Sequence, residues 1–160
     1  MSAAVKRLVL RRNQDRRVRG GHPWIFSNEV ARLDGAPAPG DLVEVTDERG
    51  AFLGRAYFNP QSLIAARLLT RGRDEVDAAL FVKRMERALR LREAALPGER
   101  AVRVVYGESD QLPGLVVDRY GDHLAVQVLT LGMEVRQEMV REALERVFAP
   151  QGVVRVAASP

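Results

Sequence analysis

The sequence contains no cysteine and only two histidines, His22 and His123, which lie far apart in the chain. Without thiols the chain has no disulfide framework, no thiolate metal site and no thiol nucleophile. Two distant histidines do not form the ligand spacing of a metal site. Carboxylates and arginines are therefore the side chains that are left to carry chemistry or binding.

Long apolar runs are missing as well. No stretch approaches the roughly 20 apolar residues of a membrane-spanning helix. The short apolar stretch near the N-terminus has basic residues on both sides, which does not fit a secretory signal. With 46% apolar and 29% charged residues the composition is that of a globular protein. We expect a cytoplasmic protein without a membrane partner.

Lysine is almost absent, since Lys6 and Lys83 are the only two, and arginine supplies most of the positive charge. The net charge of +4 is unevenly placed, because residues 1–20 contain seven basic side chains and a single acidic one, Asp15. A strongly basic end predicts a polyanionic partner. The planar fork of arginine suits phosphate oxygens in particular. The alternative is a solvated basic arm in an arginine-rich protein.

Short strands separated by turns are expected in the first 74 residues. Apolar residues alternate or cluster between turn signals, with one short helix after the first strand. The expected strands are KRLVLR (6–11), DLVEVTD (41–47), AFLGRAYFN (51–59) and SLIAARLLT (62–70), and the helix lies in NQDRRVRGG (13–21). This pattern predicts a small β-barrel over residues 1–74.

Helices and strands are mixed in the remainder of the chain. A helix is predicted at about 76–95, where Phe81, Met85, Ala88 and Leu89 form one apolar stripe. Strands are predicted at 101–108, 114–121, 123–130 and 152–158. A second helix is predicted at 133–148, with an apolar face made of Val135, Met139, Val140, Ala143 and Val147. We expect a helical connector over 75–98 and a small α+β domain over 99–160.

The segment YGESDQLPGLVVDRYGD (106–122) gathers four carboxylates that could act as acid, base or metal ligand. They are Glu108, Asp110, Asp118 and Asp122. Catalytic carboxylates need a partner group and a pocket, and no cluster of metal ligands lies beside them in the sequence. The Leu112-Pro113-Gly114 turn and the Tyr120-Gly121-Asp122 hairpin signal instead favour scaffolding. Glu108, Asp110 and Asp118 are therefore expected to shape the loop by hydrogen bonds.

The segment GGHPWIFSNEV (20–30) contains the one tryptophan of the chain, Trp24. A tryptophan can stack on a nucleobase. A single tryptophan in a small domain more often packs in the core. We expect the core role for Trp24.

With the opening strand and the basic helix, RVRGGHPWIFSNEV (17–30) resembles the start of a PUA domain. The resemblance is to the PUA domain that heads S-adenosylmethionine-dependent ribosomal RNA methyltransferases of the cytosine-C5 type. Residues 40–70 are similar to the second half of that barrel, and YGESDQLPGLVVDRYGDHLAVQ (106–127) resembles the signature of the family's middle domain. Gln111 departs from this signature, since most relatives carry glycine there. The resemblance covers nearly the whole chain.

The resemblance implies the RNA-binding portion of a methyltransferase whose Rossmann-like catalytic domain follows the middle domain. This chain has no G-x-G-x-x-G motif and no cysteine nucleophile. We therefore expect no Rossmann-like domain and no catalytic, cofactor-binding or metal-binding residue within it. S-adenosylmethionine is expected as the cofactor of the full-length protein only. The expected partner is structured RNA, in particular ribosomal RNA, and a homodimer stays open.

The expected RNA contacts lie mainly in the basic end of the chain. Arginine side chains there would contact phosphates, which supply most of a salt-dependent affinity. The phosphate candidates are Arg11, Arg12, Arg16, Arg17 and Arg19, with Arg67, Arg71 and Arg73 as a second set. The resemblance also places Gly20, Gly21 and His22 near the RNA.

Two other functions stay open at this point. The chain could be a free-standing PUA adaptor that binds RNA without any methyltransferase. It could also be a small carboxylate-dependent hydrolase built on Glu108, Asp110 and Asp118.

Overall fold

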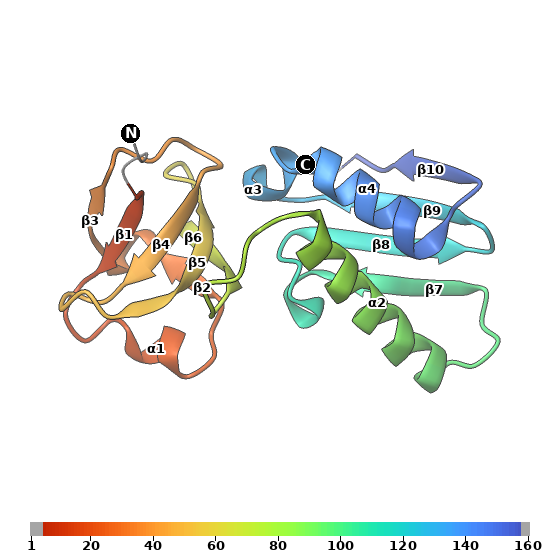
Figure 1. The fold of residues 1–160 in the computed structure, drawn as a ribbon, viewed down its shortest axis with the longest axis horizontal. Coiled ribbons are helices and arrows are strands. Elements are labelled where there is room, and N and C mark those ends of the chain that lie inside the picture. Colours follow the sequence, from red (N-terminus) through yellow and green to blue (C-terminus); the bar gives the residue numbers. More distant parts are fainter. Residues whose placement is uncertain (1–4, 158–160) are drawn as a thin grey trace. The chain divides into compact units, whose positions relative to one another are not determined.

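The structure, a computed structural model, describes residues 5–157. The chain divides into two compact units, residues 1–74 and residues 75–160. Each unit has its own β-sheet (Figure 1). In the described residues no helix has the length and apolar character needed to cross a membrane.

The first unit is built on a curled six-stranded sheet in the order β2-β6-β5-β4-β1-β3. The strands are β1 (Arg7–Leu10), β2 (Trp24–Phe26), β3 (Val30–Asp34), β4 (Leu42–Thr46), β5 (Phe52–Phe58) and β6 (Ile64–Thr70). Strand β1 runs parallel to β4, and the other pairs are antiparallel. The end strands β2 and β3 are consecutive in the chain, joined by the 3-10 helix η1 (Ser27–Glu29). Because these two edge strands do not pair with each other, the curled sheet is a half-barrel, which is consistent with the PUA-like barrel that the sequence predicted.

The core of the first unit lies inside this curl. Strands β1, β4, β5 and β6 and the short helix α1 (Arg16–Arg19) lie within the segments predicted for them. Helix α1 contributes Val18 to the core. The other buried members are Leu8, Leu10, Ile25, Val43, Val45, Leu53, Ala56, Phe58, Ala65, Ala66 and Leu68. The two strands that the sequence did not predict, β2 and β3, are short and carry little apolar alternation.

Trp24 is not part of this core, so the expected core role is wrong. Successive side chains of a strand point to opposite faces. Ile25 is completely buried and faces the core, whereas Trp24 and Phe26 are only partly buried on the other face of β2. The core of this unit is filled by aliphatic side chains and Phe58, which leaves the tryptophan at the surface.

The second unit is a four-stranded sheet in the order β10-β9-β8-β7 with two longer helices. The strands are β7 (Ala101–Tyr106), β8 (Leu115–Tyr120), β9 (His123–Val128) and β10 (Gly152–Arg155), and only β10 is paired in parallel. The helices are α2 (Ala78–Ala95), the one-turn α3 (Leu131–Glu134) and α4 (Gln137–Phe148). Helix α2 packs against α4 and β7 through Phe81, Met85 and Ala88 (Figure 1). The helix expected as a connector thus contributes to the core of this unit.

The predicted helix over 133–148 is interrupted between α3 and α4. Thr130 caps α3 by accepting a hydrogen bond from the Met133 N–H. The first helical turn therefore begins at Leu131, earlier than predicted, and ends at Glu134, before α4 begins. Val135 lies at the break and is 56% exposed, so its assignment to the buried face is wrong. The buried residues of α4 are Val140, Ala143 and Leu144.

Asp110 anchors the loop between β7 and β8. Both of its carboxylate oxygens accept hydrogen bonds from Arg92, at 2.6 and 2.7 Å, and one also accepts from the Tyr106 N–H at 2.7 Å. Asp118 in β8 makes a similar two-bond pair with Arg103 of β7, at 2.7 and 3.0 Å. The expected structural role of these two carboxylates is confirmed.

The turn that follows Asp110 requires a left-handed residue. Gln111 has φ 61° and ψ 26°, a conformation that glycine adopts without cost. Its carbonyl accepts a hydrogen bond from Arg84 at 2.5 Å. Glutamine therefore stands in a conformation that suits the glycine expected there.

The hairpin predicted at residues 120–122 is confirmed, since Tyr120 pairs with His123 across a two-residue turn.

Candidate nucleic-acid interface

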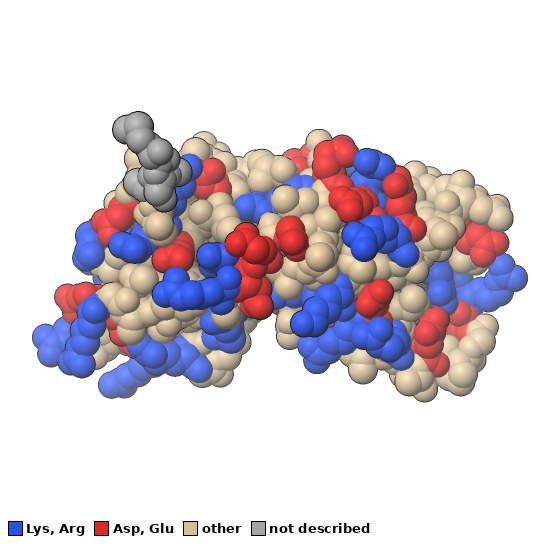
Figure 2. Space-filling view, in the orientation of Figure 1, with Lys and Arg blue, Asp and Glu red and all other residues tan. Residues whose placement is uncertain are grey.

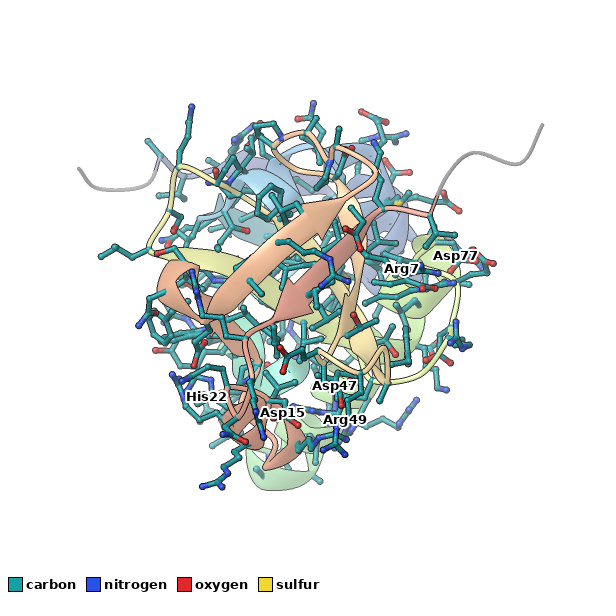
Figure 3. The ribbon with its side chains drawn as sticks, turned by 90° about the vertical axis from the view of Figure 1, so that its left-hand side faces the viewer. Arg7, Asp15, His22, Asp47, Arg49 and Asp77 are labelled. Atoms are coloured by element: carbon teal, nitrogen blue, oxygen red, sulfur yellow. The ribbon has the colours of Figure 1, made fainter. Side chains whose placement is uncertain are left out.

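A cavity of about 440 Å³ opens at one end of the first unit. It lies between the β1–α1 connection, α1 and the β4–β5 turn. Its lining, here called the arginine cavity, consists of Arg11, Arg12, Asn13, Asp15, Arg16, Arg19, Asp47, Glu48 and Arg49. Figure 3 shows Asp15, Asp47 and Arg49 together at this end of the unit. Four of the predicted phosphate contacts are thus brought together, and Arg49 is added to them.

Arg19 is the anchored member of the arginine cavity. Its Nε donates to Asp15 at 2.5 Å and its Nη2 donates to Asp47 at 2.7 Å. The hydrogen bond from Arg19 lowers the pKa of Asp15, and the same bond raises the pKa of Arg19. Asp47 also accepts from the N–H groups of Arg49 and Ala51, which fixes the β4–β5 turn. Arg19 therefore ties α1 to this turn, and its charge is already compensated.

The other four arginines of the cavity form no ion pair with a described residue. Arg11, Arg12, Arg16 and Arg49 are exposed, and within residues 5–157 none of them is within 4.0 Å of a carboxylate oxygen. Most other arginines of the first unit are held by acidic or carbonyl groups. Five arginines against the carboxylates of Asp15, Asp47 and Glu48 leave the cavity lining a net charge of +2, a positive field that suits a polyanion.

A second cluster lies on the β2 side of α1. This aromatic face consists of Arg17, His22, Trp24, Phe26 and Arg67. The Arg67 guanidinium lies 5.8 Å from the centroid of the Trp24 ring, and the Arg17 guanidinium lies 4.9 Å from that of Phe26. His22 meets Trp24 edge-on at 5.7 Å, and Trp24 meets Phe26 in the same way at 6.5 Å. Two of the predicted phosphate arginines therefore lie over aromatic rings.

Glu29 holds the aromatic face in place from below. This carboxylate is only 4% exposed, and it accepts hydrogen bonds from Arg17 Nη1 at 3.1 Å and from the Phe26 N–H at 2.7 Å. The backbone N–H of Trp24 donates to His22 Nδ1 at 3.1 Å, so this ring nitrogen is the acceptor. The positions of Arg17, His22 and Phe26 are thus set by hydrogen bonds within the unit.

The remaining predicted residues have other surroundings. Arg71 donates to the carbonyl groups of Val18 and His22, at 2.6 and 3.3 Å, and so closes the connection from α1 to β2. Gly20 and Gly21 form this connection, and Gly21 has φ 105°. Arg73 pairs with Glu44 at 3.2 Å and lies 4.3 Å from the Phe52 ring centroid. Neither Arg71 nor Arg73 lines the arginine cavity.

The net positive charge of the chain lies on the first unit. Residues 1–74 contain 13 basic and 8 acidic side chains, whereas residues 75–160 contain 12 and 13. Figure 2 shows basic side chains along the lower edge of the first unit, where Figure 1 places α1.

Arg49 was missed in the sequence because it lies in a turn 30 residues after Arg19. The only sequence signal for it is a basic residue at the tip of the Glu48-Arg49-Gly50 turn.

The carboxylates of the second unit make a different arrangement. Asp110 and Asp118 are each paired with an arginine. Across residues 5–157, no group of three or more histidine, aspartate or glutamate side chains is placed to hold a metal ion.

Comparison with known proteins identifies the first unit. Residues 8–71 match the family of PUA-like domains. The chain is 37% identical over 145 residues to ribosomal RNA large subunit methyltransferase I of Cronobacter sakazakii, and 38% identical over 145 residues to that of Erwinia tasmaniensis. Each match covers 89% of this chain and 37% of the relative, so the chain spans little more than a third of these proteins.

Solved structures share the fold. A Streptococcus mutans protein assigned as a SAM-dependent methyltransferase superposes with a TM-score of 0.79 at 19% identity, over 94% of this chain and 40% of that one. The structure of a candidate methyltransferase complexed with SAH gives the same values. Residues 8–71 therefore form a PUA-like domain, and the chain is homologous to ribosomal RNA large subunit methyltransferase I over about 37% of that protein's length.

Proposed function

We propose that this chain binds structured RNA through the arginine cavity of its PUA-like unit. The observation that carries the proposal is the set of four exposed arginines without an ion pair among the described residues, Arg11, Arg12, Arg16 and Arg49, around one cavity with a net positive lining. Arginine forks match phosphate oxygens in geometry as well as in charge. Arg19 would orient the cavity rather than supply free charge, because Asp15 and Asp47 hold it.

The names of the relatives support ribosomal RNA as the partner. Both named relatives are methyltransferases of large-subunit ribosomal RNA. We therefore propose ribosomal RNA as the partner, and a role in recognising and positioning it for a catalytic domain outside this chain. That domain would bind S-adenosylmethionine. The resemblance in sequence supports cytosine C5 as the methylated position. A glycine-rich cofactor motif and a cysteine encoded downstream of the codon for Pro160 would support these points, and the absence of both would contradict them.

The proposal requires a strong dependence of affinity on salt. Each phosphate that an arginine neutralises releases condensed counterions, so the logarithm of the affinity falls linearly with the logarithm of the salt concentration. The slope is about 0.7 to 0.9 per phosphate contact. Phosphates carry no sequence information, so different structured RNAs should be affected alike.

Filter binding of a ribosomal RNA fragment across a salt series tests this proposal. The test variant replaces Arg11, Arg12, Arg16 and Arg49 with Gln, and its slope should flatten by about three units. The control replaces Arg87, Arg90, Arg141 and Arg146 of the second unit with Gln, which removes the same net charge. The control should keep a slope within about one unit of the unmodified chain. Equal losses in the two variants would show that only total charge matters, and would overturn the proposal.

A further inference from the structure

We infer that the aromatic face, made of Arg17, His22, Trp24, Phe26 and Arg67, is a stacking site for an unpaired nucleobase of the bound RNA. This inference rests on the proposed RNA-binding function. It adds a second contact of a different chemical kind, on the opposite side of α1 from the arginine cavity.

The hydrophobic core of the first unit does not include the rings of Trp24 and Phe26. Ile25 alone fills the inward position of β2, and Trp24 and Phe26 remain partly exposed on the other face. Tryptophan and phenylalanine are the largest apolar side chains, and leaving them in contact with water forgoes part of their burial energy. Two such rings at adjacent outward positions of a short edge strand therefore indicate a surface for a planar apolar partner.

The chemistry of the neighbouring side chains also suits a nucleobase. The guanidinium groups of Arg67 and Arg17 lie over the Trp24 and Phe26 rings, at 5.8 and 4.9 Å from the ring centroids. Nucleobases that are unpaired stack on aromatic rings and on arginine guanidinium planes. The two positive charges also favour the phosphate that accompanies each base. The cluster thus offers planes and charge at the same place.

The cluster is also held in place before any ligand binds. Buried Glu29 accepts hydrogen bonds from Arg17 and from the Phe26 backbone N–H. The backbone N–H of Trp24 donates to His22 Nδ1. A site whose side chains are already positioned loses less conformational entropy on binding.

The position of α1 connects the two contacts. Arg16 and Arg19 of this helix line the arginine cavity, while Arg17 lies against Phe26 and His22. An RNA strand that crosses α1 would place phosphates in the arginine cavity and a base on the aromatic face. A base can reach the face only when it is unstacked, as in a loop or bulge. The expected ligand is therefore a loop nucleotide of a structured RNA.

The emission of Trp24 reports directly on this site, because it is the one tryptophan of the chain. The chain is titrated with a short oligoadenylate and with an abasic ribose-phosphate oligomer of the same length. Oligoadenylate should quench the Trp24 emission and bind about tenfold more tightly than the abasic oligomer, a gain typical of one stacked base. The abasic oligomer should bind through its phosphates and leave the emission unchanged.

A variant removes the stacking plane and keeps an apolar side chain. Trp24→Leu should lose the tenfold preference for oligoadenylate, measured by the anisotropy of labelled oligomers, while its affinity for the abasic oligomer stays the same. Tyr120→Leu is the matched control, because Tyr120 is an exposed aromatic residue of the second unit. That control should keep the preference.

The outcomes separate the two proposals. Salt-dependent binding of both oligomers with equal affinity and unchanged Trp24 emission would overturn the stacking site and leave the arginine cavity standing. Binding of neither oligomer would overturn the stacking site, and filter binding of the ribosomal RNA fragment then decides on the arginine cavity by itself. A preference for oligoadenylate that survives in folded Trp24→Leu would place the base elsewhere and would also overturn the stacking site.

Discussion

Single side chains in this protein fall into pairs that fix structure and groups that are left free for a ligand. Arg92 and Asp110 are a structural pair, since the Asp110 side chain is 3% exposed and that of Arg92 is 21% exposed. Arg103 and Asp118 form a pair of the same geometry at the surface, with Arg103 48% exposed. The cost of removing one partner rises with burial, because the remaining charge is then unpaired away from water.

Asp110→Asn should lower the free energy of unfolding of the second unit by about 2 kcal/mol, because Arg92 keeps its charge and loses its ionised partner. Asp118→Asn, whose partner Arg103 is exposed, should cost less than about 1 kcal/mol. Urea unfolding of both variants measures the difference. RNA affinity should be unchanged in each. Equal costs in the two variants would contradict the assignment of Asp110 as the buried anchor of the loop.

Asp15 limits the positive charge of the arginine cavity. Asp15→Asn should raise RNA affinity about fivefold, because one unit charge near a phosphate is worth roughly 1 kcal/mol in water. Asp34→Asn changes the net charge equally but lies in β3 beside Arg32, outside the cavity. This control should have a much smaller effect in the same filter-binding assay. A decrease in affinity for Asp15→Asn would show that positioning of Arg19 matters more than charge.

The Asp15–Arg19 pair also makes a pH-dependent contribution to the stability of the fold. The hydrogen bond from Arg19 lowers the pKa of Asp15 below its usual value of 3.8. A carboxylate whose pKa is lower in the folded state stabilises the fold above its unfolded pKa, and this contribution is lost as the pH falls through the folded value. The contribution is therefore fully present at neutral pH, where RNA binding would be measured.

At the scale of elements, close contacts decide which residues the turns can hold. Gly114 follows the Leu112-Pro113 turn with φ 83°, and a Cβ there would clash with Thr130. Thr130 in turn caps α3. A side chain at Gly114 would therefore strain the backbone and displace the cap of the next helix together.

Gly114→Ala should destabilise the second unit by about 3 kcal/mol, from the left-handed backbone, worth about 1–2 kcal/mol, and the displaced Thr130. Gly98→Ala is the matched control, because Gly98 has φ 81° and nothing within 4 Å of an added Cβ. It should cost only about 1 kcal/mol. Thermal unfolding followed by circular dichroism compares the two. Similar midpoints would show that the contact with Thr130 relaxes freely.

The sequence predicted the elements whose patterns are local, and missed those that depend on tertiary contacts. Strands β4, β5 and β6 and helix α2 carry clear periodicity and turn signals, and they form where predicted. Strand β2 has three residues, too few for alternation to be recognised, and its pairing with β6 is what sends Trp24 outward. Arg49 joins the arginine cavity only because Asp47 holds the β4–β5 turn against Arg19.

At the scale of the whole molecule, we propose that the first unit binds RNA, because the net positive charge lies there. The second unit has nearly balanced charge, and several of its exposed arginines pair with glutamates along α4. Phosphate contacts would dominate the affinity, and a base on the aromatic face would add preference for unpaired nucleotides.

An NMR titration of the whole isotope-labelled chain with a ribosomal RNA fragment tests this central claim most directly. We expect the amide shifts to change first and most at residues 11–13, 15–16, 19 and 47–49, which line the arginine cavity, and these changes to fade as salt is raised. The side-chain Nε–Hε signals of Arg11, Arg12, Arg16 and Arg49 should move with them. Shifts confined to residues 75–157, with the arginine cavity unchanged, would contradict it.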